Sequence, residues 1–354
     1  MELTTDEFLE RIGGFGRYQI LLTVFSNVAY MLWWGMPTMV MLFIAAEPGW
    51  KCKNNATCPF TEIKRLGDDN YSFRCDIPRE DWEFGNDFTS VVTEFDLVCE
   101  RGSFGFISTS VIFLGFFIGS ICVSTISDKF GRKHPLFVCG FICAIFNFAS
   151  VFAPAFWVFA VFRCIIGFMQ GAFTIPVFVL ATELSGVRHR STGGALIWLG
   201  FSAAVMSLAG LAYLIRDWKQ LTMVSGAPGI LFVACWFFTP ESIRWYLKKG
   251  RVSDAMNVLR KVAKVNGKKM PDATLKLPND EKKERLGDFR DLFSSVKMAH
   301  KTLLSWLMWF TASLISWGTS FHAPFLGGNI YVNVVISSLT VVPAYPIMAG
   351  LTLK

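Results

Sequence analysis

The chain is organised around the stretch Thr125-Ile126-Ser127-Asp128-Lys129-Phe130-Gly131-Arg132-Lys133-His134-Pro135, which combines one acid with four basic or titratable groups. No charged residue occurs from Gly102 to Ser127 or from Pro135 to Phe162. A helix of about 20 apolar residues crosses the hydrocarbon core of a bilayer. The stretch is therefore predicted to be a tight turn between two membrane spans. Its excess of lysine and arginine is typical of the cytoplasmic side.

The composition favours an all-α polytopic membrane protein. Of the 354 residues, 53% are hydrophobic and 17% are charged, whereas a soluble domain is about one quarter charged. The alternative, a large soluble helical protein, does not need several uncharged runs of this length. The net charge of +7 is explained by basic cytoplasmic loops, and no nucleic-acid partner is expected. The acidic N-terminus lacks the basic region of a cleaved signal peptide, so the first span is expected to be retained.

Eight largely uncharged runs predict eight membrane spans. They lie at about 18–46, 104–126, 135–153, 156–181, 193–214, 221–239, 302–322 and 329–351. Residues 1–18 are then a cytoplasmic N-terminus, 19–239 a six-span bundle and 302–354 two further spans. Basic turns orient the chain with both termini in the cytoplasm. Pro37 is expected to kink the first span because proline removes a backbone hydrogen bond.

The polar segment 47–103 is predicted to lie outside the cell. Acidic residues outnumber basic ones in it, and it contains Cys52, Cys58, Cys75 and Cys99. Two disulfides are expected, with all three pairings open. Asn55 and Asn70 begin glycosylation sequons in the same segment. Metal binding is the weaker alternative, because the segment has neither a CxxC pair nor a histidine.

The hydrophilic segment 240–301 carries twice as many basic as acidic residues. Ser253 to Ala263 places its apolar residues at helical spacing, with Ser253 as a candidate N-cap. Asp288 to Met298 is a second, shorter candidate. We expect amphipathic helices at the cytoplasmic surface.

Six motifs occur in a characteristic order along the chain. They are Gly14–Gln19, Thr93–Arg101, Ser127–Lys133, Thr182-Glu183 with Arg190, Pro240–Leu247, and Gly327–Tyr331 with Val342–Tyr345. In these motifs the chain resembles, over essentially its whole length, the organic cation/carnitine transporter family (solute carrier family 22) of the major facilitator superfamily. It departs from the family pattern at Ser124, Ile243 and Val341; the last replaces an acid that commonly precedes the Val-Pro-Ala of span eight.

The resemblance implies a major facilitator fold of two six-span bundles. This chain would hold a complete N-terminal six-helix bundle plus two helices of the C-terminal bundle. It implies a plasma-membrane transporter that moves carnitine-like organic cations or zwitterions by alternating access, facilitatively or with a coupling ion. No enzyme and no cofactor are expected, since the sequence has no metal constellation, nucleophile elbow or P-loop. The alternative is a truncated isoform or incomplete gene model that at most pairs with a full-length relative.

Three groups of site residues follow. Candidate cavity residues are Trp33, Trp34, Gln170, Trp198, Phe201, Trp309, Trp317 and Tyr345, each aromatic having lipid-facing or core packing as its alternative. Candidate residues of a cytoplasmic gate are Asp128, Gly131, Arg132, Lys133, Glu183, Arg190, Glu241 and Arg244, with solvated loops as the alternative. Arg163 is the one charge in the middle of a span, and its role is either structural or coupling, because buried charges in membranes are paired or functional.

Overall fold

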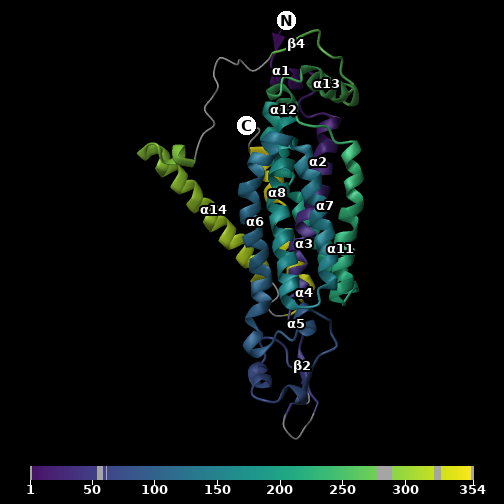
Figure 1. Ribbon diagram of the computed structural model, residues 1–354, viewed down its shortest axis with the longest axis vertical. Helices are drawn as coiled ribbons and strands as arrows, with labels where there is room; N and C mark the ends of the chain where they lie inside the picture. The colour runs from purple at the N-terminus through teal and green to yellow at the C-terminus, as the bar shows by residue number, and fades with distance from the viewer. Residues whose placement is uncertain (1, 54–58, 61, 277–288, 323–327, 352–354) are drawn as a thin grey trace.

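The computed structural model describes residues 2–53, 59–60, 62–276, 289–322 and 328–351. Long helices lie side by side in an elongated bundle (Figure 1). The N-terminus and α13 (Val252–Asn266) lie at one end, which we call the cap end. The strand β2 (Trp50–Cys52) lies at the opposite end, which we call the loop end.

The bundle is built from helical segments of membrane-spanning length, several of which combine two or more elements. Its main helices are α6 (Ser103–Phe130), α7 (Lys133–Ala149), α8 (Phe156–Glu183), α9 (Arg190–Leu196), α10 (Leu199–Leu214) and α11 (Trp218–Phe232). Short 3₁₀ turns adjoin them: η5 (Ser150–Phe152), η6 (Val187–His189) and η7 (Val233–Phe237). Large apolar side chains on the outer faces are exposed, such as Phe117 on α6 and Leu231 on α11. Such faces suit a lipid environment.

Seven helical segments among the described residues are long and apolar enough to cross a membrane. They are Arg17–Ile44, Cys99–Val123, Lys133–Phe152, Phe156–Glu183, Val187–Leu214, Trp218–Phe237 and Ile330–Met348. They coincide with the predicted spans one to six and eight. The predicted seventh span corresponds to α14 (Val296–His322), a helix of 27 residues that is not among the seven. The total of eight spans therefore stays a prediction.

The first span is interrupted near Pro37. It consists of α2 (Arg17–Ala29), a π-helical turn η1 (Tyr30–Gly35), α3 (Met36–Met39) and α4 (Met41–Ile44). Pro37 has no N–H to donate to the carbonyl of Trp33, one turn earlier. The expected disturbance is present as the π-helical turn, a form often found at functional positions.

Small residues allow α6 and α8 to approach closely. A Cβ on Gly119 would lie 2.0 Å from the carbonyl oxygen of Phe168, and one on Gly167 would lie 2.0 Å from that of Ile112. Backbone contacts of this kind hold helices together in membranes, where burial from water provides no driving force.

The cap end joins the first residues of the chain to the segment after the sixth span. Its elements are β1 (Glu2–Leu3), α1 (Thr5–Arg11), α12 (Ile243–Lys248), α13 and β4 (Thr274–Leu275), and β1 pairs in parallel with β4. On α1, Phe8 and Leu9 are buried in the same apolar cluster as Val258 and Leu259 of α13. The helix predicted around Ser253 to Ala263 is present, with Arg251 rather than Ser253 at its N-cap.

The second predicted surface helix, Asp288 to Met298, is wrong for the described part of that stretch. It contains the 3₁₀ turn η8 (Phe289–Phe293), and α14 begins at Val296. Of the apolar residues of this stretch, Leu292 and Phe293 therefore lie in the 3₁₀ turn, and Val296 lies at the start of the long helix.

The loop end folds around two buried tryptophans. β2 pairs in antiparallel fashion with β3 (Trp82–Phe84), and Trp50 of β2 and Trp82 of β3 are both buried. The remaining elements are η2 (Tyr71–Cys75), η3 (Arg79–Asp81), α5 (Val91–Glu94) and η4 (Cys99–Arg101). Cys75 is bonded to Cys99 as a disulfide, and Cys52 is also disulfide-bonded. Cys58 and Asn55 lie outside the described residues, whereas Asn70 is exposed.

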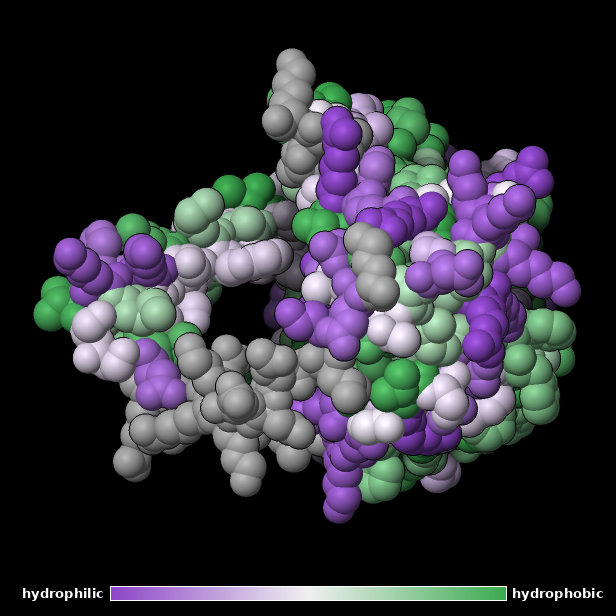
Figure 2. Space-filling model, turned by 90° about the horizontal axis from the view of Figure 1, so that it is seen from above, coloured by the Kyte–Doolittle hydropathy of each residue, from purple (hydrophilic) through white to green (hydrophobic). Residues whose placement is uncertain are grey.

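The last helices pack on the bundle at one side. α15 (Ile330–Val341) contacts α10, and α16 (Ala344–Leu351) contacts α9. The first half of α14 stands away from the bundle in two views (Figures 1 and 2). Towards its C-terminal end α14 returns to the bundle, where Trp317 and Phe321 contact Phe113 of α6.

Candidate functional site

An aromatic cluster lies where α14 meets the bundle. The ring centroid of Trp34 is 4.8 Å from that of Phe201, 5.5 Å from Trp198 and 6.3 Å from Trp317. Four predicted cavity residues from three spans thus come together. The sequence analysis missed two further members, Phe113 and Phe116, because α6 has apolar residues on every face. We call these six side chains (Trp34, Phe113, Phe116, Trp198, Phe201 and Trp317) the aromatic cluster.

Two further aromatic candidates, Tyr345 and Trp309, differ in position. Tyr345 is half-buried and forms a side-chain hydrogen bond with Ser202, the neighbour of Phe201 on α10. Trp309 is 70% exposed on the part of α14 that stands away from the bundle. It does not contribute to the cluster, because two turns of helix separate it from Trp317.

Trp33 and Gln170 are fully buried inside the bundle. The Gln170 amide donates to the carbonyls of Trp33 (3.3 Å) and Trp34 (3.2 Å) and accepts from the Thr38 hydroxyl (3.0 Å). It thereby donates to carbonyls beside the π-helical turn and Pro37, in a region without water to replace it. The Trp33 carbonyl also accepts from the Cys143 thiol at 3.2 Å. Pro37 was the sequence signal for this role of Gln170, because a proline inside a helix leaves a carbonyl one turn earlier without its usual N–H donor.

Arg163 is fully buried in α8 and its neighbours are neutral. It donates to the side-chain oxygens of Asn147 (3.0 Å) and Ser150 (3.2 Å) and to the Pro37 carbonyl (3.4 Å). Its guanidinium also lies 4.8 Å from the centre of the Phe159 ring. Among the described residues no carboxylate pairs with it. Neutral acceptors and a ring face therefore stabilise this charge, and they tie three spans together.

Glu241 binds backbone groups of the turn between the second and third spans, in the motif Ser127–Lys133. Its carboxylate accepts from the amides of Arg132 (2.8 Å) and Lys133 (3.2 Å) at the start of α7, and it is 5% exposed. An acid at a helix N-terminus is stabilised by the helix dipole. Gly131, at φ +94°, leaves the room that this carboxylate occupies. Glu241, a predicted gate residue, thus receives two backbone amides, and His134 Nδ1 lies 3.9 Å from its carboxylate.

Three predicted gate residues converge beside this turn. Arg132 Nη2 donates to Asp128 Oδ1 at 3.1 Å, and Arg132 Nε lies 3.7 Å from Glu183 Oε2. The Ser242 hydroxyl, which caps α12, donates to the same Glu183 oxygen. Lys133 extends over the ring of Trp236, 5.0 Å from its centre. The charges of α6, α7 and α8 are thus linked to α12.

Asp6 joins the two remaining gate residues. It accepts from Arg190 Nη2 (2.9 Å) and from Arg244 Nη2 (2.8 and 3.0 Å). The sequence analysis missed Asp6, since nothing near it along the chain marks a partner. We call Asp6, Asp128, Arg132, Glu183, Arg190, Glu241, Ser242 and Arg244 the cap-end network. Hydrophilic side chains cover this end of the bundle (Figure 2).

Comparison with known proteins defines the family. Residues 90–338 match the model of the family "Sugar (and other) transporter". Organic cation/carnitine transporter 4 of Arabidopsis thaliana is 34% identical, the alignment covering 99% of this chain and 66% of that protein. Solute carrier family 22 member 15-like of Xenopus laevis is 31% identical, covering 97% and 67%. The chain belongs to solute carrier family 22 of the major facilitator superfamily.

Human organic cation/carnitine transporter 2 is 36% identical to this solute carrier family 22 chain over 283 residues, which cover 77% of the chain and 50% of the human protein. The chain therefore spans between half and two thirds of the length of these relatives. The proton:xylose symporter XylE, with 14% identity, superposes with a TM-score of 0.60 over 95% of this chain and 69% of that one. This likeness shows the major facilitator fold. The relatives are transporters and not enzymes.

Proposed function

We propose that this solute carrier family 22 chain moves small organic cations or zwitterions of the carnitine type across the plasma membrane by alternating access. Transport is facilitative or coupled to an ion. Substrates in this superfamily bind near the middle of the membrane, between bundles. The aromatic cluster, where α14 meets the six-span bundle, is the observation that carries the proposal.

The chemistry of the cluster favours a positively charged substrate. The spans hold no Asp or Glu clear of their ends, so a cation entering them meets no carboxylate. Faces of tryptophan attract ammonium groups, quaternary ones included. The ring centroid of Trp34 lies 5.5 Å from that of Trp198 and 6.3 Å from that of Trp317, and Tyr345 adds a hydroxyl nearby. These groups can replace part of the water around a quaternary amine.

We assign the cap end to the cytoplasm and the loop end to the outside. The basic residues of the turn at Lys129–Lys133 and of α12 and α13 support this, because positive charges accumulate on the cytoplasmic side. The disulfide Cys75–Cys99 and the exposed sequon residue Asn70 suit an oxidising exterior. Both termini are then cytoplasmic, and glycosylation is expected at Asn70 and Asn55.

The cap-end network acts in this proposal as part of the inner gate. The contacts among its members Asp128, Arg132 and Glu183 all lie within the first six spans and the cap end. They hold the inner ends of these helices together as one body. Opening of the inside then separates this body from the second bundle, and the network keeps its own shape.

Uptake of a radiolabelled quaternary amine tests the proposal directly. Cells that express the chain are compared with cells that express the R163M variant and with empty-vector cells, after surface labelling has established equal exposure. Saturable uptake that unlabelled carnitine inhibits is expected. Background uptake at normal surface expression would refute the proposal. The alternative of a product that only pairs with a full-length relative has no observation in its favour.

A further inference from the structure

The sixth span ends at the cap end in two aromatic side chains that the protein leaves uncovered. Phe237, the last residue of η7, is 82% exposed, and Phe238, which follows it, is 76% exposed. Trp236, which precedes both, is of a residue type enriched where the hydrocarbon core meets the lipid headgroups. These three residues therefore mark the level of the membrane surface at the cap end.

Two lysines from different elements meet at this level. Lys261 of α13 donates from Nζ to the carbonyl of Phe238 at 3.1 Å. Lys133, at the start of α7, extends over Trp236 with its Nζ 5.0 Å from the ring centre. The two ammonium groups are close enough for their like charges to repel. We call these five residues (Lys133, Trp236, Phe237, Phe238 and Lys261) the lysine corner.

The described residues do not neutralise the charge of the lysine corner. Neither ammonium group takes part in a salt bridge within the part of the chain that the structure describes. Glu241 attracts Lys133, but its carboxylate is buried and already accepts backbone amides. Residues 255–271, which include most of α13, contain no acid and five basic residues: Arg260, Lys261, Lys264, Lys268 and Lys269.

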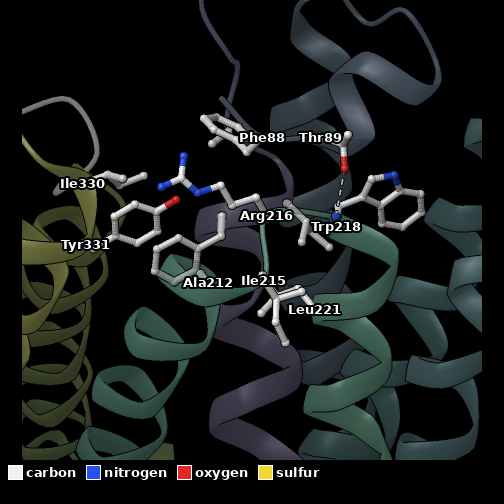
Figure 3. A pocket seen from close by; sticks show the side chains of 12 residues that line it. Phe88, Thr89, Ala212, Ile215, Arg216, Trp218, Leu221, Ile330 and Tyr331 are labelled. Carbon is white, nitrogen blue, oxygen red and sulfur yellow. Dashed lines mark hydrogen bonds between the residues drawn. The ribbon is translucent and has the colours of Figure 1, made fainter. Parts of the chain in front are cut away.

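The opposite end of the sixth span differs in this respect. There Lys219 Nζ binds Glu94 Oε1 at 2.7 Å, and the amide of Trp218 donates to Thr89 Oγ1 at 3.0 Å (Figure 3). At the loop end the protein therefore supplies its own acid for the lysine of this span. At the cap end two lysines share one corner without an acid, directly above rings that are exposed to lipid.

We propose that the lysine corner binds the headgroup of an acidic phospholipid, of which phosphatidylserine is the fitting example. The phosphate and the carboxylate of the lipid contact the two ammonium groups and relieve their repulsion. The acyl chains lie along the exposed rings of Phe237 and Phe238. Lysine is a common phosphate ligand, and basic sites at the cytoplasmic ends of spans suit acidic headgroups. The exposed rings favour a lipid over a free anion, which gains nothing from them.

A lipid in this position joins two parts of the protein. It connects α13 to the start of α7, next to Arg132 of the cap-end network. Bound lipid therefore holds the cap end against the bundle. The assignment of this lipid to the cytoplasmic leaflet rests on the orientation proposed above, whereas binding itself does not depend on transport.

Native mass spectrometry of the purified full chain in detergent tests the site. The probe is dioctanoyl phosphatidylserine, and the ligand controls are dioctanoyl phosphatidylcholine and O-phosphoserine. One saturable phosphatidylserine adduct is expected. The double variant K133Q/K261Q should bind this lipid about 5- to 30-fold more weakly, since each lysine at a membrane surface contributes a few-fold to the attraction of anionic lipid. Phosphatidylcholine should bind weakly, and equally to both proteins.

The matched control is K268Q/K269Q, which removes the same charge from two exposed lysines just beyond α13. It should leave the affinity for phosphatidylserine within about twofold. Equal losses in the two double variants would show general electrostatic attraction and overturn the proposal. O-phosphoserine that binds as tightly as the lipid would also overturn it, because the exposed rings would then have no part.

The single variant K261Q keeps the test independent of any folding defect in the double variant, because its ammonium group bonds only to a backbone carbonyl. A loss of affinity of about fivefold is expected, and an unchanged affinity would refute the proposal. Circular dichroism and gel filtration establish that each variant is folded. Because the readout is lipid binding, its failure is separate from failure of the transport proposal.

Discussion

The carboxylate of Glu241 occupies the space that a side chain on Gly131 would need. A Cβ built on Gly131 would lie 2.1 Å from Glu241 Oε2, and the backbone there has a φ of +94°. The same carboxylate receives the amides of Arg132 and Lys133. The turn between the second and third spans and the residue after the sixth therefore depend on each other.

G131A should destabilise the protein by about 2–4 kcal/mol, because it combines backbone strain with a steric clash. A thermal shift in detergent measures this as a lower Tm. The matched control is G210A, at a glycine of α10 with open space around it, which should leave the Tm unchanged or raise it slightly. Equal Tm values for G131A and the unmodified protein would contradict the interpretation that this turn requires a glycine next to the Glu241 carboxylate.

D6N should loosen the cap end, because it weakens the attraction of Arg190 and Arg244 for α1. The side chain of Asp6 is 36% exposed, so the loss should be no more than about 1 kcal/mol. Faster hydrogen exchange across Thr5–Arg11 is the measurement, since local opening sets that rate. E10Q removes an equal charge from the same helix. If E10Q accelerates exchange as much as D6N does, the ion pairs of Asp6 with Arg190 and Arg244 do not specifically hold α1 in place.

Q170M should cost about 2–4 kcal/mol, because it leaves the Thr38 hydroxyl and the carbonyls of Trp33 and Trp34 without this partner in the membrane interior. The Tm in detergent should fall accordingly. T174V removes a hydroxyl that bonds only to its own helix, at 2.7 Å from the Gln170 carbonyl, and should have a small effect. A Tm for Q170M equal to that of T174V would show that water or other groups satisfy these carbonyls.

W317L should raise the KM for a quaternary amine about 5- to 30-fold, through the loss of a cation–π contact of about 1–2 kcal/mol. W309L is the control from the same helix, because Trp309 is 70% exposed and stands outside the aromatic cluster. Initial uptake rates at equal surface expression give both values. A similar KM change in both variants would place the substrate elsewhere.

Acidification should release α1 at its first turn. Hydrogen bonds from the backbone and side chain of Thr4 hold the pKa of Glu7 below its ordinary value of 4.5. A lowered folded-state pKa means that the capping box contributes stability above the unfolded value, and that this stability is lost as the pH falls through the folded value. Exchange of the α1 amides, corrected for its intrinsic pH dependence, should therefore rise below pH 4.5. E7Q should reduce this step.

Local composition was enough to locate the spans and the charged turns. Span length depends on the thickness of the bilayer, and the side of each loop depends on its basic residues. The apolar spacing around Val258 and Leu259 likewise predicted α13. The six motifs in their order along the chain, those around Asp128 and Glu241 among them, predicted the family before any geometry was available.

Only the tertiary structure decided which residues meet. Asp6 and Arg244 are 238 positions apart, and no pattern near either one indicates the other. Trp309 and Trp317 look alike in sequence, but only Trp317 lies where α14 reaches the bundle. The amide of Gln170 on α8 binds backbone carbonyls of the first span, and the sequence around Gln170 does not indicate these partners. Contacts of this kind depend on how helices pack, which the order of residues along one helix does not specify.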